Sequence, residues 1–126
     1  MDRHKIRRVR SGIEDEYAWV SIWFRTDARN LEVLHISCAK TDRHPVTGHL
    51  YLERDDQAIA CYGGATKVVL GADGIDLHLN NKGMKSLMLE GIVCLVVPEK
   101  LSGWKKAFCV FQEMATYPAG GVIKLG

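Results

Sequence analysis

The sequence lacks any long hydrophobic run. Its longest uninterrupted apolar stretch, Ile92 to Pro98, is far shorter than the roughly 20 residues that a transmembrane helix needs. The first ten residues, MDRHKIRRVR, are highly charged and lack the apolar centre of a secretion signal. We therefore expect a cytoplasmic protein that makes no membrane contact.

The sequence also lacks a Cys-x-x-Cys pair, which argues against a disulfide framework. Each of its four cysteines sits in an apolar run, where a free thiol behaves as a small core residue: Cys38, Cys61, Cys94 and Cys109. We expect these thiols to be reduced and mostly buried.

Metal-ligating residues are densest between His35 and His49, where the group consists of His35, Cys38, His44 and His49. A structural zinc site needs about four such ligands that converge tetrahedrally. His35 and Cys38 are three residues apart on a predicted strand, so their side chains should point to opposite faces. Scattered histidines are the favoured interpretation, and we expect no metal and no cofactor.

Charge is small and unevenly placed. The net charge is +2, yet residues 1–10 alone carry +4, because they contain five basic residues and one acidic residue, Asp2. The remainder of the chain therefore carries −2. A basic N-terminal arm over residues 1–12 could contact phosphates, but the favoured interpretation is a solvated first strand or a frayed terminus.

Period-two alternation predicts strands over much of the chain. Strands are expected at Tyr17–Arg25, Leu31–Ala39, His49–Arg54, Lys67–Leu70, Ile75–Asn80 and Gly91–Val97. The segment Asp27 to Asn30 is expected to be a polar turn, and residues 80–88 a loop with one helical turn. Asp73-Gly74 is a favoured primed-turn pair and predicts a hairpin. The last strand is apolar on both faces, which is typical of a central, covered strand.

After Pro98 the hydrophobic period changes to three or four residues, which predicts an amphipathic helix. Pro98 suits its first turn, and Gly103 should weaken it by roughly 1 kcal/mol relative to Ala. Residues 121–126 are expected to add an edge strand or to hang free as a flexible tail. The whole chain, residues 1–126, is predicted to be one α+β domain: a mainly antiparallel β-sheet with one C-terminal amphipathic helix packed on one face.

The strand from Tyr17 to Arg25 has an aliphatic face and an aromatic face, and the latter carries Tyr17, Trp19 and Trp23. If the helix covers the aliphatic face, the aromatic face is partly exposed, as at many protein-binding surfaces. If the helix or the tail covers the aromatic residues instead, they are part of the core. The sequence leaves both arrangements open.

Two patterns could indicate catalysis. Cys61, with Gly63 and Gly64 as backbone donors and a nearby histidine, would be a hydrolase nucleophile, and Glu53 with Asp55 and Asp56 would be an acid–base pair or Mg²⁺ ligands. The favoured interpretation is that Cys61 faces inward, the glycines shape a turn and the carboxylates bond to turn backbone. We therefore expect no catalytic residue and no enzyme.

A short motif carries a resemblance to a known family. The segment Tyr51 to Gln57 (YLERDDQ), followed by Cys61-Tyr62-Gly63-Gly64 and the strand Lys67 to Leu70, resembles family ten of the predicted immunity proteins of bacterial polymorphic toxin systems. The strand from Asn30 to His35 and the loop from Thr41 to Gly48 sit where that family has a strand and a polar loop. The resemblance covers about residues 15–116.

The resemblance implies a binding protein that neutralises a cognate bacterial toxin and acts as a monomer or homodimer. A few anchor side chains usually dominate such an interface. The expected partner-binding residues are Trp19, Trp23, Glu53, Asp56, Gln57 and Tyr62. Gly63, Gly64, Asp73 and Gly74 are expected to be structural turn residues.

A second hypothesis is a small nucleic-acid-binding module that uses the basic arm and the tryptophans. It would depend on Arg7, Arg8 and Arg10 and would weaken with salt. The arm itself has no aromatic residue on which a base could stack. We rank this hypothesis below the toxin-binding hypothesis, because only the latter is supported by the family resemblance.

Overall fold

The computed structural model describes residues 2–25 and 31–126, without the side chains of Asp2, Asp56 and Gln57. The polar turn expected from Asp27 to Asn30 lies outside the described residues. The strands are β1 (Asp2–Ile13), β2 (Tyr17–Phe24), β3 (Glu32–Ala39), β4 (Tyr51–Arg54), β5 (Asp56–Tyr62), β6 (Ala65–Gly71), β7 (Gly74–Leu79), β8 (Ile92–Val96) and β9 (Ile123–Leu125). The helices are α1 (Asn81–Leu87) and α2 (Trp104–Met114), and η1 (Pro118–Val122) is a 3₁₀ turn.

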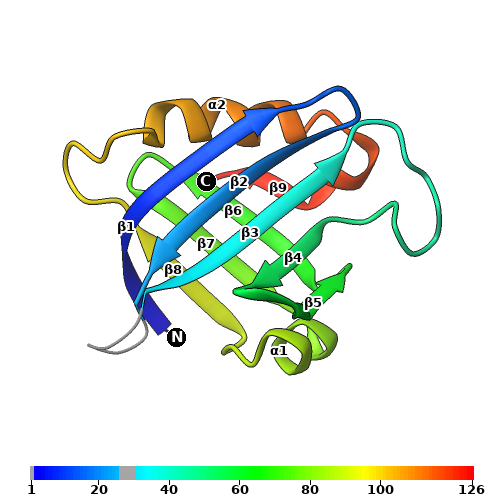
Figure 1. The fold of residues 1–126 in the computed structure, drawn as a ribbon, viewed down its shortest axis with the longest axis horizontal. Coiled ribbons are helices and arrows are strands. Elements are labelled where there is room, and N and C mark those ends of the chain that lie inside the picture. The colour runs from blue at the N-terminus through cyan, green and yellow to red at the C-terminus, as the bar shows by residue number, and fades with distance from the viewer. Residues whose placement is uncertain (1, 26–30) are drawn as a thin grey trace.

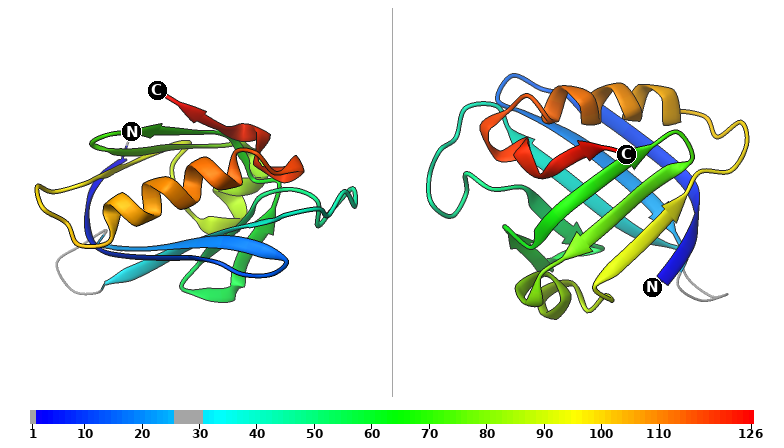
Figure 2. Two further views of the ribbon diagram at one scale, coloured as in Figure 1. Left: turned by 90° about the horizontal axis from the view of Figure 1, so that it is seen from above. Right: turned by 180° about the vertical axis from the view of Figure 1, so that it is seen from behind.

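The strands form one mixed sheet that folds over on itself. Their order is β5-β4-β3-β2-β1-β8-β7-β6-β9. Figure 1 shows β1 to β5 as a front layer, with β6 to β9 running across behind it. Seen from above, α2 lies between the two layers along one side (Figure 2). The described part of the chain is thus an α+β structure, mostly sheet, with two helices.

Alternating residues of the front layer build the core. On β2, Ala18, Val20, Ile22 and Phe24 are fully buried, and β3 and β4 add Leu34, Ile36 and Leu52. The back layer and α2 supply the other side of the core, including Leu70, Leu77 and Phe111. The aliphatic face of β2 therefore packs inward, and the opposite face of the front layer points away from the core.

Residues 2–12 are not a projecting arm. They belong to β1, which pairs antiparallel with β2 and parallel with β8 and so joins the two layers. Ile6 is fully buried and Val9 nearly so. A bulge between Ile6 and Arg8 shifts the register, so the two inward residues are three apart instead of two. This shift hides the strand pattern in the sequence.

Two of the eight strand pairings are parallel among the described residues: β1 with β8, and β6 with β9. The sheet is therefore mixed, although antiparallel pairs predominate. The described chain has two helices, and the short helix α1 lies where the sequence predicts a loop with one helical turn. Helix α2 contacts β1 and β2 in front and β9 behind. β9 is an edge strand beside β6, so the last residues take part in the sheet.

The helix after β8 begins later than the sequence indicates. Lys100 has φ 63° and Gly103 has φ 86°, and these left-handed residues interrupt any helix from Pro98. Gly103 is the N-cap of α2 and does not lie within it. Neither α1 nor α2 is long and apolar enough to cross a membrane, and no other described segment is a helix of that length.

One smaller prediction needs correction, and another is confirmed. The β6–β7 hairpin turns at Ala72 and Asp73, because Gly71 pairs with Gly74, the first residue of β7. Asp73 does not have the positive φ that a primed turn requires, whereas Gly74 has φ 148°. The cysteines are mostly buried, as expected: Cys38, Cys61 and Cys94 are buried, whereas Cys109 is exposed because the helical period turns it away from the core.

Candidate functional site

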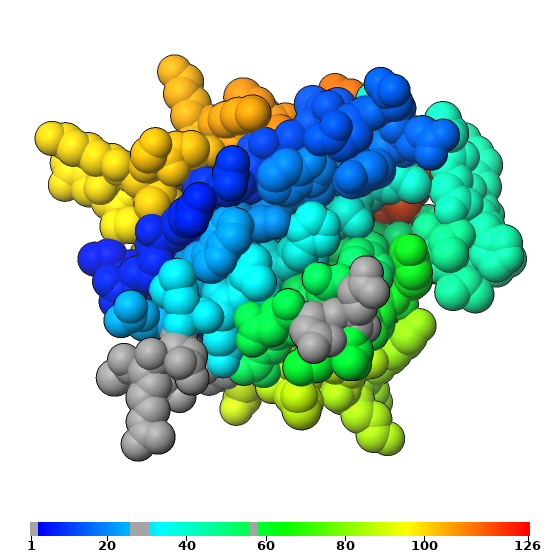
Figure 3. All heavy atoms as spheres, in the orientation of Figure 1, coloured from blue at the N-terminus to red at the C-terminus, as the bar shows by residue number. Residues whose placement is uncertain are grey.

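The outward side of the front layer gathers most of the protein's partly exposed aromatic rings. We call this surface the aromatic face and define it by Tyr17, Trp19, Trp23, His35, Tyr51 and Tyr62. Figure 3 looks onto this side of the molecule, with β1, β2 and β3 side by side and the loop of residues 41–48 standing out beside them. Tyr17 is 43% exposed, and Trp19 and Trp23 are partly exposed. Of the two arrangements that the sequence allows, the aromatic face is thus the uncovered one.

Strand register sets the rows of this face. Directly paired residues share one side of a sheet, so one row runs from Ser21 on β2 through His35 on β3 to Glu53 on β4. On β1, Arg10 pairs with Ser21 and extends the row toward the basic side. The row therefore changes from positive at β1 to negative at β4.

A second row runs parallel to the first. Trp19 pairs with Ser37, Ser37 with Tyr51, and Tyr51 with Tyr62 at the end of β5. The Tyr51 and Tyr62 rings lie with their centroids 4.9 Å apart and tilted by 51°. The register thus brings Tyr62 and Trp19, which are far apart in the chain, to the two ends of one row.

Both tryptophans are held by polar contacts. Trp19 Nε1 donates a 3.0 Å hydrogen bond to Glu14 Oε1, and its ring stacks on His35 at 6.0 Å between centroids. The Arg8 guanidinium lies 5.0 Å from the centre of the Trp23 ring, within cation–π range. Fixed rings lose little entropy on binding, so both are suited to anchor a partner.

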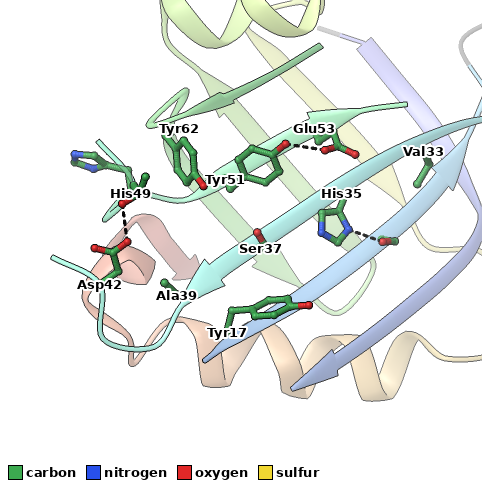
Figure 4. Close-up of a pocket in the computed structure, with 12 residues that line it drawn as sticks. Tyr17, Val33, His35, Ser37, Ala39, Asp42, His49, Tyr51, Glu53 and Tyr62 are labelled. Atoms are coloured by element: carbon green, nitrogen blue, oxygen red, sulfur yellow. Dashed lines mark hydrogen bonds between the residues drawn. The ribbon is translucent and has the colours of Figure 1, made fainter. Parts of the chain in front are cut away.

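A shallow hollow of about 680 Å³ lies in this face, between β2, β3, β4 and the 41–48 loop. Its lining includes Ser21, His35, Asp42, Tyr51, Glu53 and Tyr62. Figure 4 shows Tyr51 and Tyr62 side by side, with Glu53 and His35 further along the same surface. The hollow thus combines aromatic and ionisable residues in one concave feature.

His35 occupies the middle of the hollow. Its Nδ1 shares a 2.8 Å hydrogen bond with Ser21 Oγ, whose residue is only 7% exposed. Burial lowers the pKa of His35 below 6.5, and the nearby Glu53 carboxylate opposes this in part. The imidazole is therefore mainly neutral near pH 7.

Glu53 and Tyr51 form a second fixed pair. The Tyr51 hydroxyl donates a 2.6 Å hydrogen bond to Glu53 Oε1. Burial, this hydrogen bond and the carboxylate charge all raise the pKa of Tyr51 well above 10.0, so its hydroxyl stays a donor. The bond fixes the direction of the Glu53 carboxylate in the hollow.

The corner after β4 holds the other motif residues. Asp55 has φ 62°, and its carboxylate accepts a 2.8 Å hydrogen bond from Val33 N–H. Arg54 forms a bidentate ion pair with Glu32 and donates to the carbonyls of Leu87 and Met88 at the end of α1. Asp55 and Arg54 therefore hold the corner. The side chains of Asp56 and Gln57 lie outside the described residues.

Backbone conformation and close packing explain why positions 63 and 64 are both glycine. Gly63 has φ 70°, a left-handed conformation that favours glycine. A Cβ at Gly64 would lie 2.5 Å from Cys61 Sγ and 2.9 Å from the Gly83 Cα of α1. Asn80, the N-cap of α1, donates from its side chain to the Gly63 carbonyl. These glycines hold α1 against the end of β5.

The catalytic alternatives find little support in this geometry. Burial raises the pKa of the Cys61 thiol, and Gly63 N–H donates to Leu50 O, so that N–H is not free to bind an oxyanion. Cys38 is buried inward while His35 faces out, and no three potential ligands meet among the described residues to hold a metal ion.

The expected binding residues separate into groups. Glu53 and Tyr62 line the hollow, Trp19 borders it through His35, and Trp23 lies at the other end of β2 beside Arg8. Sequence reasoning missed Tyr51 and the role of His35. The signal was present, because both alternate with inward residues on strands that the sequence predicts.

Comparison with known proteins identifies no relative. No family model, no curated protein and no solved structure matches the chain.

Proposed function

We propose that this chain is a protein-binding module of the immunity type, which neutralises a cognate bacterial toxin in the cytoplasm by binding it through the aromatic face. The observation that carries the proposal is the row of Trp19, Tyr51 and Tyr62 beside a concave hollow. Tryptophan and tyrosine are enriched among interface residues that dominate affinity. The immunity resemblance rests on the YLERDDQ and Cys-Tyr-Gly-Gly segments, which border this face.

The scaffold behind the face suits such a role. The inward residues of β2 are fully buried, and α2 contacts β1 and β2 from the core side. The motif corner is fixed by Arg54, Asp55 and the glycines. A rigid surface binds with a smaller entropic cost than a surface that orders on binding.

Tagged protein in a lysate of the native bacterium should retain one stoichiometric partner that carries a toxin domain. Trp19→Ala or Trp23→Ala should weaken its capture at least about 30-fold, as expected for an anchor residue. Lys67→Ala is the matched control, because Lys67 is exposed on β6 in the other layer. Quantitative mass spectrometry of the eluates measures the ratio, and circular dichroism checks that each variant is folded.

Equal capture of the partner by wild type and both tryptophan variants would exclude the aromatic face as the interface. Salt-sensitive recovery of nucleic acid in place of a protein would support the second candidate function. One observation favours that candidate: Arg8 and Arg10 project from β1 on the same side as Trp23 and Ser21. Bases could stack on the rings while arginines contact phosphates.

A further inference from the structure

The charge of the hollow differs from that of the β1 side of the face. Among the described residues that line it, the acidic side chains are Asp42 and Glu53, and the lining includes no lysine or arginine. His35 is mainly neutral near pH 7, as its lowered pKa implies. The hollow therefore presents negative charge to a partner.

The two carboxylates do not have the same capacity to bind a ligand. Asp42 accepts hydrogen bonds from His44 N–H at 2.8 Å and from Thr47 Oγ1 at 2.6 Å, so it is committed to its own loop. Glu53 accepts one 2.6 Å hydrogen bond from Tyr51 at Oε1. A carboxylate offers about four acceptor positions, so Glu53 keeps capacity for a further donor.

Aromatic rings flank this carboxylate. The Tyr51 and Tyr62 ring centroids are 4.9 Å apart, the rings are tilted by 51°, and both residues line the hollow. Tyrosine faces attract cations, and a guanidinium both stacks on a ring and bonds a carboxylate in its plane. A phosphate would instead meet the charge of Glu53 with no cationic partner in the lining.

We propose that the hollow receives an arginine side chain of the partner protein, whose guanidinium bonds the Glu53 carboxylate and stacks against Tyr51 and Tyr62. The proposal rests on the proposed function, because it assigns the chemistry of the group that enters the same face. In this arrangement a basic side chain of the partner binds the acidic side of the aromatic face, and acidic groups of the partner can contact the basic β1 side.

The test uses the whole protein, labelled with ¹⁵N, and the probe N-acetyl-arginine methylamide at millimolar concentration. Amide resonances of His35, Tyr51, Glu53 and Tyr62 should shift in a saturable manner. The citrulline analogue has the same shape without the charge and should cause no such shifts. Glu53→Gln should weaken the arginine probe about tenfold or more, because it removes the charged acceptor.

Glu53→Gln keeps the size of the side chain and an oxygen that can accept from Tyr51, so the fold should be retained. Glu99→Gln is the matched control, since Glu99 is exposed in the segment before α2. Tyr62→Leu should also weaken the arginine probe, because it removes one ring face. Equal shifts by the two probes, an unchanged affinity in Glu53→Gln, or saturable shifts in the hollow with inorganic phosphate would overturn the proposal.

The captured partner separates this proposal from the proposed function. If Trp19→Ala abolishes capture while Glu53→Gln leaves it unchanged, the face binds protein but the arginine assignment is wrong. If neither tryptophan matters, the proposed function itself fails. If Glu53→Gln loses capture of the partner while the control Glu99→Gln retains it, the result would support both the proposed function and the arginine assignment.

Discussion

His35 couples the hollow to the stability of the protein. The imidazole is partly buried between Ser21 and Trp19, and burial lowers its pKa from 6.5. The unfolded chain therefore binds a proton on His35 at a higher pH than the folded chain does. As pH falls from 6.5 through the folded-state pKa, the unfolded state gains more protons, so this residue makes the folded state less stable.

We expect the free energy of unfolding of His35→Gln to fall less steeply below pH 6.5 than that of the wild type. Urea titrations across this pH range measure the difference. His49→Gln serves as the control, because His49 is exposed. Parallel pH curves for the wild type and His35→Gln would show that His35 is not responsible for the slope.

At the scale of elements, the start of α2 is set by backbone geometry. Gly103 has φ 86°, and a Cβ at this position would lie 2.9 Å from the Val9 carbonyl oxygen of β1. The close approach lets α2 pack on β1, and Trp104 and Ala107 of this helix are buried. Gly103 therefore supports the contact between helix and sheet.

Gly103→Ala should lower the free energy of unfolding by about 1–3 kcal/mol, because it forces a left-handed alanine against the β1 carbonyl. A glycine inside a helix would give the opposite result, a gain of roughly 1 kcal/mol on replacement by alanine. Gly121→Ala is the control, since a Cβ there meets nothing within 4 Å. Chemical denaturation of the wild type and the two variants measures their free energies of unfolding. A more stable Gly103→Ala variant would contradict the N-cap assignment.

At the scale of the whole molecule, β1 connects the two layers of the sheet. It pairs with β2 in the front layer and β8 in the back layer, and α2 packs on it. Its inward residues Ile6 and Val9 belong to the common core. Disruption of β1 should therefore affect both layers at once.

Ile6→Ala should lower the free energy of unfolding by about 2–5 kcal/mol, because Ile6 is 0% exposed on the strand that connects the two layers. Ile13→Ala, on the same strand but 50% exposed, should change it by less than about 0.5 kcal/mol. Unfolding followed by circular dichroism and by tryptophan fluorescence measures both variants. If Ile6→Ala lowers the stability no more than Ile13→Ala does, β1 is not needed to hold the two layers together.

The sequence could predict those features that depend on local alternation. Strands β2 and β3, the inward aliphatic face of β2 and its outward tryptophans follow from a period of two residues, and β8 follows from a continuous apolar run. Positive φ at Gly63 also fits its chemistry, because glycine lacks a Cβ. Glu53 and Tyr62 could be chosen from a motif, but their distance from Trp19 could not.

Only the tertiary structure decided which of these residues meet. The bulge in β1 breaks the alternation that would have revealed a strand, and Lys100 and Gly103 take left-handed conformations that no hydrophobic period reports. The hollow needs the register of three strands to place Ser21, His35 and Glu53 in one row. Sequence thus determined which face each side chain takes, whereas long-range strand pairing, which local propensity does not encode, determined its neighbours.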